Sequence, residues 1–169
     1  MPDQTEPEQH RFRALALPAT LTLYRLARAL CADRARADDL LQETYLRAWR
    51  YFAGYQGGDI RAWLAAIMRN LHRSGLSADP PLIDLSALDD QPDPAPDPEQ
   101  SAMRAHENRA LRHHLAALPE ALRETLMLRE FADLSYAEIA KIQNVPVGTV
   151  MSRLARARAT LREMLHHDL

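Results

Sequence analysis

Residues 135–158 (SYAEIAKIQNVPVGTVMSRLARAR) constrain the fold more than any other stretch of this sequence. Ser135 and Glu138 have the spacing of a capping box, in which each side chain bonds to the backbone N–H of the other residue where a helix begins. Asn144 tolerates the left-handed conformation that often ends a helix, and Pro146 suits the first turn of a second helix. The stretch therefore predicts two short helices joined by a tight turn, which is a helix-turn-helix.

The second of these helices is expected to have two unlike faces. Its apolar residues recur at three- and four-residue spacing and predict a core-facing stripe. They are Val150, Leu154, Ala157 and Leu161. The opposite face combines small polar side chains with arginines, which suits a helix that lies in a DNA major groove. Its residues are Thr149, Ser152, Arg153 and Arg156. A helical hairpin with a solvated arginine face is the simpler alternative, although the small residues beside Gly148 favour close approach to DNA.

The composition of the whole chain limits the remaining possibilities. A chain of 169 residues, of which 47% are apolar, can form one domain or two small ones. The single cysteine, Cys31, excludes an internal disulfide and fits a reducing compartment. No apolar run approaches the ~18 residues of a membrane span, and the N-terminal residues are too polar for a signal peptide. We therefore expect a soluble, cytoplasmic protein without membrane insertion.

The formal charge of −2 is distributed unevenly along the chain. Two regions of net charge +3 and +2 flank residues 74–100, which hold seven acids and no base. This acidic segment is also rich in proline and has no aromatic residue, so it cannot form a core. We predict an all-α protein in which a flexible acidic linker, residues 77–102, joins two small helical domains, residues 1–76 and 103–169.

The first domain is predicted to contain three helices. The apolar pattern indicates helices over residues 15–30 and 35–52, and Asp59 is placed to cap a third helix that begins at Ile60. One face of the second helix mixes acids with large apolar groups, which is typical of a surface that binds a partner. Its residues are Asp39, Gln42, Glu43, Leu46 and Trp49. A position in the core is the alternative for Trp49.

The sequence has no recognisable catalytic or metal-binding motif. His106 and Glu107 begin like the zinc motif H-E-x-x-H, but Ala110 stands at the position of the second histidine. Adjacent histidine pairs point to different sides of a helix and do not converge on one ion. There is also no glycine-rich phosphate loop. We therefore predict that the protein is not an enzyme and needs no metal or cofactor.

Three blocks of the chain, in this order and at this spacing, form one pattern. They are residues 37–50 (ADDLLQETYLRAWR), 59–71 (DIRAWLAAIMRNL) and 134–150 (LSYAEIAKIQNVPVGTV). The pattern resembles the alternative bacterial RNA polymerase sigma factors of the extracytoplasmic-function type (ECF, group IV). With the helices between the blocks, the resemblance covers nearly all of the chain outside the N-terminal tail and the linker. The last block alone is shared with other helix-turn-helix regulators.

The resemblance implies that the protein binds core RNA polymerase, directs it to specific promoters and assists promoter melting. The partners it implies are core RNA polymerase, through the clamp helices of the largest subunit and the flap region, promoter DNA and an anti-sigma factor. By position, the polymerase-binding residues would be Asp39, Gln42, Glu43, Tyr45 and Trp49. The residues that engage the −10 element would be Arg61, Arg69, Asn70 and Arg73. Those that read or contact the −35 element would be Thr149, Ser152, Arg153, Arg156 and Arg158.

The sequence departs from the family pattern at two places. These departures affect which promoter sequence the protein would recognise, not the class of protein to which it would belong. Met151 and Ala155 stand where many members have a basic residue and a larger side chain, and residues 74–77 replace a basic run after Arg73. Two rival functions stay open. A helix-turn-helix regulator without sigma activity would bind duplex DNA without polymerase. A sigma-like decoy would bind polymerase without forming an open complex.

Overall fold

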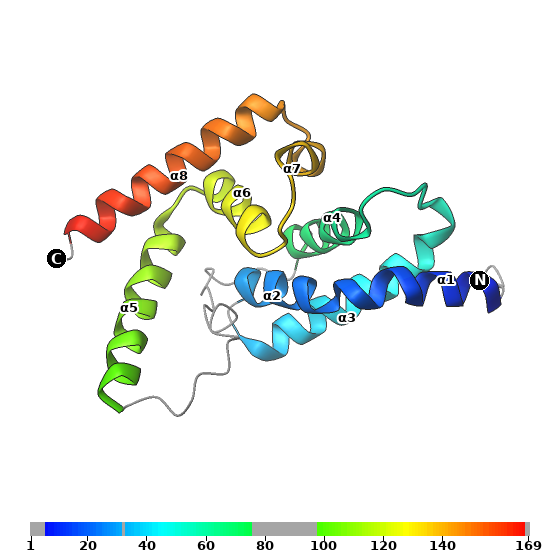
Figure 1. The fold of residues 1–169 in the computed structure, drawn as a ribbon, viewed down its shortest axis with the longest axis horizontal. Coiled ribbons are helices and arrows are strands. Elements are labelled where there is room, and N and C mark those ends of the chain that lie inside the picture. The colour runs from blue at the N-terminus through cyan, green and yellow to red at the C-terminus, as the bar shows by residue number, and fades with distance from the viewer. Residues whose placement is uncertain (1–5, 32, 76–97, 168–169) are drawn as a thin grey trace.

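The computed structural model describes residues 6–31, 33–75 and 98–167, and within these ranges it consists of helices and short connections without a strand (Figure 1). The all-α class predicted from the sequence is confirmed. Residues 6–75 form the first lobe and residues 98–167 the second. The first lobe contains α1 (Glu6–Ala16), the 3₁₀ turn η1 (Leu17–Ala19), α2 (Thr20–Leu30), α3 (Arg34–Tyr51), η2 (Phe52–Gly54) and α4 (Ile60–Arg73). The second contains α5 (Pro98–Ala117), α6 (Glu120–Glu130), α7 (Tyr136–Gln143) and α8 (Val147–His167).

The first lobe is a bundle in which α2, α3 and α4 each pack against the other two. Large side chains at helical spacing are fully buried where these helices meet; they are Leu23, Leu26, Leu40, Leu64 and Met68. Burial of each such side chain contributes roughly 1.5–3 kcal/mol relative to leaving it exposed. A cluster of aromatic rings, with neighbouring centroids 5.1 to 6.5 Å apart, extends this core; it comprises Phe12, Tyr45, Trp49, Phe52, Tyr55 and Trp63.

The chain becomes helical earlier than its apolar pattern indicates. α1 begins at Glu6, in the polar N-terminal stretch, and buries Phe12 and Ala16 against the bundle. Pro18 lies in η1, where its missing N–H leaves no helical hydrogen bond unmade, and α2 begins after it at Thr20. The helix predicted over residues 15–30 is therefore confirmed from Thr20 onward, whereas residues 15–19 belong to the end of α1 and to η1, at the point where Pro18 made the predicted start uncertain.

Aspartate caps determine where α3 and α4 begin. Asp33 accepts a hydrogen bond from the backbone N–H of Arg36 at 2.9 Å, so α3 begins at Arg34, one residue before its predicted start. Asp59 accepts a hydrogen bond from the backbone N–H of Arg61 at 2.9 Å. This bond confirms the cap that the sequence predicts for α4.

The helix-turn-helix has the local structure that its sequence predicts. The Ser135 hydroxyl accepts from the N–H of Glu138 at 3.2 Å, and the Glu138 carboxylate accepts from the N–H of Ser135 at 2.8 Å. The capping box is therefore complete. Leu134 and Ile139 flank it and are both fully buried, as in a hydrophobic staple.

The turn between α7 and α8 closes in a left-handed conformation. Asn144 has φ of 54°, its N–H donates to the carbonyl of Lys141 at 3.3 Å, and the N–H of Val145 donates to the carbonyl of Ala140 at 3.0 Å. These two bonds form a Schellman motif, which satisfies the last carbonyls of α7. The carbonyl of Pro146 then accepts from the N–H of Thr149 at 3.0 Å and from that of Val150 at 3.3 Å, and the second of these is the first α-helical bond of α8. On α8 the predicted core stripe is confirmed; Val150, Leu154 and Ala157 are buried and Leu161 packs partly against them.

The described part of the second lobe begins inside the segment predicted to be linker. α5 starts at Pro98, a residue suited to the first turn of a helix, where an N–H would have no partner. In Figure 1, α5 extends away from α1–α4, and it packs against α8. Residues 76–97, which make up most of the predicted linker, lie outside the described residues, so its boundaries and flexibility stay predictions.

The two lobes pack against each other. α2 contacts α6 and α4 contacts α7, and Figure 1 places α4 beside the second lobe. Among the described residues, the buried apolar side chains of both lobes form one continuous cluster. The sequence predicts two lobes but contains no local signal for this contact.

Replacing Asn144 should test the backbone of the turn. Asn144→Ala should lower the free energy of unfolding by about 1 kcal/mol, because alanine is strained in the left-handed region. Asn144→Gly is the control and should change it by only roughly a few tenths of a kcal/mol, because glycine has no Cβ. Urea unfolding followed by circular dichroism measures both. An equal loss in the two variants would contradict the backbone explanation.

Candidate polymerase and promoter interfaces

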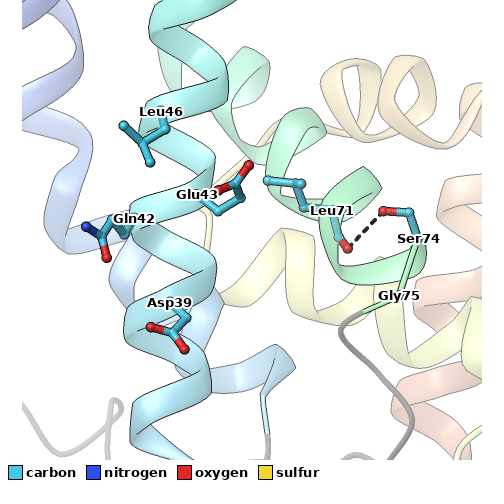
Figure 2. A pocket seen from close by; sticks show the side chains of 7 residues that line it. All are labelled: Asp39, Gln42, Glu43, Leu46, Leu71, Ser74 and Gly75. Carbon is cyan, nitrogen blue, oxygen red and sulfur yellow. Dashed lines mark hydrogen bonds between the residues drawn. The ribbon is translucent and has the colours of Figure 1, made fainter.

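A hollow of about 590 Å³ lies between α3 and the C-terminal end of α4 (Figure 2). One wall is a single face of α3, lined by Asp39, Gln42, Glu43 and Leu46. The other wall is formed by Leu71, Ser74 and Gly75, and the Ser74 hydroxyl donates to the carbonyl of Leu71 at 3.2 Å. The hollow thus offers carboxylates, an amide and apolar side chains to a partner.

The α3 wall of this hollow is accessible. Leu46 is 56% exposed, and Asp39 and Gln42 are exposed beside it. Glu43 is half-buried and pairs with Arg47 at 3.8 Å. When a partner covers an exposed leucine, removal of its apolar surface from water makes the free energy of binding more favourable. The partner-binding face predicted from the residue pattern includes Leu46, whereas the polymerase-binding set implied by the family resemblance omits it.

Tyr45 belongs to the predicted polymerase-binding set but does not line this hollow. Its hydroxyl donates to the carbonyl of Ala16 at 2.8 Å and lies 2.8 Å from the hydroxyl of Thr20, so it ties α3 to the α1–α2 junction. Burial raises the pKa of Tyr45, which keeps this donor protonated. The ring instead lines a neighbouring hollow of about 350 Å³ with the apolar side chains of Leu17 and Leu41.

Trp49 belongs to the core cluster as well as to the predicted surface. Its ring centroid lies 5.3 Å from that of Phe12 and 6.5 Å from that of Phe52, and the side chain is half-buried. A large part of the Trp49 side chain therefore packs in the core, as the alternative interpretation of the sequence predicts. A substitution of Trp49 is expected to affect stability as well as any binding.

Arg69 and Arg73, two of the residues predicted to engage the −10 element, lie on α4 and face the second lobe. Arg69 Nε donates to the Glu124 carboxylate of α6, and Arg69 Nη1 donates to the carbonyl of Ile142 at 3.0 Å. Arg73 Nη1 lies 3.8 Å from the same carboxylate. Asn70, between them in sequence, is exposed. The structure therefore brings the two arginines to one acid rather than leaving both in solvent.

Arg61, the remaining member of this set, is held by Asp59, the residue that caps its own helix α4. Its guanidinium donates to the Asp59 carboxylate at 2.8 and 3.2 Å, and these bonds lower the pKa of Asp59. Arg61 also lies 3.6 Å from the carboxylate of Asp133 in the second lobe. The Asp133 side chain is 82% exposed, so this second pair contributes little.

The residues predicted to read the −35 element lie along α8. Ser152 and Arg156 are exposed, and Thr149 and Arg153 are half-buried. Arg158 is exposed and pairs with Glu130 of α6 at 3.1 Å. Because the apolar stripe of α8 faces α6 and α7, this row of side chains lies on the outer side of the helix. Contact with DNA at these positions remains a prediction.

The described residues lack two features that would indicate other functions. No helix in this part of the chain is both long and apolar enough to cross a bilayer. Within the same ranges, no three histidine, cysteine, aspartate or glutamate side chains are grouped to hold a metal ion. Burial raises the pKa of Cys31 to about 11, so its thiol is protonated at neutral pH.

Comparison with known proteins identifies the family. Residues 21–78 match Sigma-70 region 2, and residues 108–161 match Sigma-70, region 4. These two matches include most of the described part of each lobe. The chain belongs to the ECF family of RNA polymerase sigma factors, as the resemblance of its three sequence blocks predicts.

Several curated relatives are similar over most of this chain. It is 36% identical to the ECF RNA polymerase sigma factor SigE of Mycolicibacterium smegmatis, over 85% of this chain and 57% of SigE. It is 35% identical to the ECF RNA polymerase sigma factor EcfG of Rhodopseudomonas palustris, over 90% of this chain and 83% of EcfG. The RNA polymerase sigma-H factor of Pseudomonas aeruginosa is 35% identical over 79% of this chain and 75% of its own length. The chain spans only 38% of a further relative, RfaY of Xanthomonas campestris.

Two solved structures have a similar fold. CnrH, solved in complex with the cytosolic domain of CnrY, aligns with a TM-score of 0.71 and 23% identity, over 95% of this chain and 91% of that one. RpoE of Bartonella quintana, solved with the anti-sigma factor NepR, aligns with a TM-score of 0.67 and 23% identity, over 94% and 99%. At 23% identity, the similarity to these two structures concerns the fold alone.

His72 lies on α4 where it faces α6. Burial lowers the pKa of His72 below its ordinary value of 6.5, and the charge of Arg123 lowers it further. Glu124 and Glu120 act in the opposite direction but do not outweigh burial. The neutral imidazole is therefore the form that the folded chain favours.

The stability of the protein should fall as the pH is lowered through 6.5. The unfolded chain binds a proton at His72 near that pH, whereas the folded chain does so only at lower pH, so protonation favours unfolding. Urea midpoints measured from about pH 8 to about pH 5 report this loss. His72→Gln should flatten the dependence, and His166→Gln, at an exposed position on α8, is the control that should keep it. An unchanged profile in His72→Gln would contradict the assignment.

Proposed function

We propose that this chain is an alternative sigma factor that binds core RNA polymerase, directs it to specific promoters and assists melting of the −10 region. The observation that supports this most is that sigma-70 regions 2 and 4 occur in order on the two lobes of one chain. A duplex-binding regulator needs only the helix-turn-helix lobe. It would leave the acidic and apolar hollow of the first lobe without a role.

Polymerase is proposed to bind the α3 wall of the hollow. Asp39, Gln42 and Glu43 supply polar contacts, and Leu46 supplies the apolar surface that a partner helix would bury. The proposed occupants are the clamp helices of the largest polymerase subunit. The flap region is proposed to contact the second lobe.

Promoter DNA is proposed to bind two separate surfaces. α4 would engage the unwound −10 strand, with arginines on the phosphates and Asn70 near a flipped base. α8 would lie in the major groove of the −35 element, as the second helix of a helix-turn-helix does. Ser152 and Arg156 would read bases, Thr149 and Arg153 would be shared between base edges and backbone, and Arg158 would contact phosphate.

Regulation by an anti-sigma factor is part of this proposal. RpoE of Bartonella quintana was solved with the anti-sigma factor NepR, and CnrH with the cytosolic domain of CnrY. Their fold is that of this chain, which supports a partner of the same class. We further propose that the chain acts in the bacterial cytoplasm, where its DNA and polymerase lie, and that it catalyses no reaction of its own.

In vitro transcription tests the proposed function directly. The purified full-length chain is combined with core RNA polymerase and a library of upstream regions. We expect promoter-specific transcripts and open complexes. Polymerase binding without an open complex would instead indicate a decoy, and specific duplex binding without polymerase would indicate a helix-turn-helix regulator.

Leu46→Ala should weaken binding to core polymerase about tenfold, because part of a leucine side chain would no longer be buried by the partner. Leu46 is exposed in the free chain, so the variant should fold normally by circular dichroism. Leu46→Met is the matched control, since methionine keeps a similar apolar volume and should keep most of the affinity. Wild-type affinity in Leu46→Ala would exclude this wall as the polymerase site.

Arg156→Ala should relax the −35 preference at one position, at a cost of about 1–3 kcal/mol for the lost base contact. Arg158→Ala should lower transcription from all promoters without changing their rank, because a phosphate contact has no base preference. Transcription from single-base −35 variants measures both. A wild-type preference profile in Arg156→Ala would show that this residue does not read a base.

A further inference from the structure

The second lobe covers part of the α4 surface that is proposed to bind the −10 strand. α4 lies beside the second lobe in Figure 1 and packs against α7. Arg61, Arg69 and Arg73 all pair with carboxylates of the second lobe, whereas Asn70 is exposed. The cationic side chains proposed for the strand are therefore already engaged within the chain.

Glu124 is at the centre of this contact. Its carboxylate pairs with Arg69, lies 3.8 Å from Arg73 and accepts a hydrogen bond from the Gln143 side chain at 3.2 Å. The side chains of Arg69 and Glu124 are only 15% and 11% exposed, so solvent and salt screen this pair weakly. Removing either partner would leave a largely buried charge uncompensated.

A carboxylate and a DNA phosphate offer the same kind of acceptor to a guanidinium. Both present anionic oxygens that accept charge-assisted hydrogen bonds. Arg69 already donates from Nε to Glu124 and from Nη1 to the carbonyl of Ile142. These N–H groups cannot donate to a phosphate at the same time. The Glu124 carboxylate therefore competes with the strand for Arg69.

Gln143, the last residue of α7, extends this network to the recognition helix. Its amide nitrogen donates to Glu124, and its amide oxygen accepts from the Thr125 hydroxyl at 2.9 Å and from Arg153 Nη1 at 3.4 Å. Arg153 lies on α8 and belongs to the set proposed for the −35 element. One polar network thus contacts side chains of both proposed DNA-binding helices.

We propose that this arrangement is a self-inhibited state, in which the Glu124 carboxylate and the Ile142 carbonyl of the second lobe occupy Arg69, and Glu124 also pairs with Arg73, so that the −10 strand is excluded from α4. The inference rests on the strand-binding role proposed for α4. Closure and strand binding use the same N–H groups, so they are mutually exclusive. The apparent affinity of the free chain for a strand is then reduced by the fraction of molecules that are open.

Glu124 is the side chain on which closure mainly depends. Arg61 and Asp133 also form a charged contact between the lobes, but its atoms are 3.6 Å apart and the Asp133 side chain is 82% exposed. Exposed pairs of this kind contribute little. A substitution of Glu124 should therefore shift the chain toward the open state, whereas one of Asp133 should have a small effect.

The experiment measures opening and strand binding on the full-length chain without polymerase. Glu124→Ala should increase the radius of gyration measured by small-angle X-ray scattering. It should also increase affinity for a fluorescein-labelled single-stranded oligonucleotide of mixed sequence about tenfold, as expected when the closed state loses one charge-assisted contact. Glu163→Ala is the control. It removes one carboxylate from an exposed position of the second lobe, on α8 and outside both proposed DNA-binding sets, so neither measurement should change.

A charge-exchange pair of variants distinguishes opening of the chain from a folding defect in Glu124→Ala. Glu124→Arg alone should open the chain by repelling Arg69, and the double variant Arg69→Glu/Glu124→Arg should restore the wild-type radius of gyration. Wild-type dimensions in both Glu124→Ala and Glu124→Arg would overturn the proposal. Opening without a gain in strand affinity would also overturn it. Failure of the sigma assignment would appear separately, as absence of transcription by the wild-type chain with core polymerase.

Discussion

The largely buried ion pair between Arg69 and Glu124 is the charged contact around which the two lobes meet. Each lobe has roughly 70 residues, a size at which a single core is only marginally sufficient. Packing of α2 on α6 and of α4 on α7 increases the buried apolar area, but apolar contact has little directional preference. The charged hydrogen bonds around Glu124 are directional, so they favour one alignment of the lobes, and they engage arginines that are proposed to bind DNA.

One face of α3 packs in the core and another face lies at the surface. Its inner face contributes Leu40, Thr44 and Ala48 to the core, and its outer face forms one wall of the hollow. Tyr45 and Trp49 lie between these faces and serve the fold through a hydrogen bond to α1 and through ring packing. The proposed polymerase contact therefore depends on the polar residues and Leu46 more than on the aromatic pair.

The interactions that hold the helix-turn-helix together join residues close in sequence, whereas the contact between the two lobes joins residues far apart in sequence. The capping box, the staple and the Schellman turn each join residues within six positions of one another. Such bonds form in any environment that allows the two helices to pack, so α8 presents the same face in the closed state and in the proposed open one. One residue of the set proposed for the −35 element, Arg153, donates a hydrogen bond to Gln143 and so joins the network around it.

The sequence by itself determined the family, the helical class, the caps at Asp59 and Ser135 and the apolar stripe of α8, because each depends on residues close together in the chain. It did not determine the environments of Trp49 and Leu46, which depend on how α1 and α4 pack on α3. Nor did it indicate that Arg69 meets Glu124, 55 residues away. Local signals specify where helices begin and end, whereas a buried ion pair between lobes forms only when the tertiary structure excludes water from both partners.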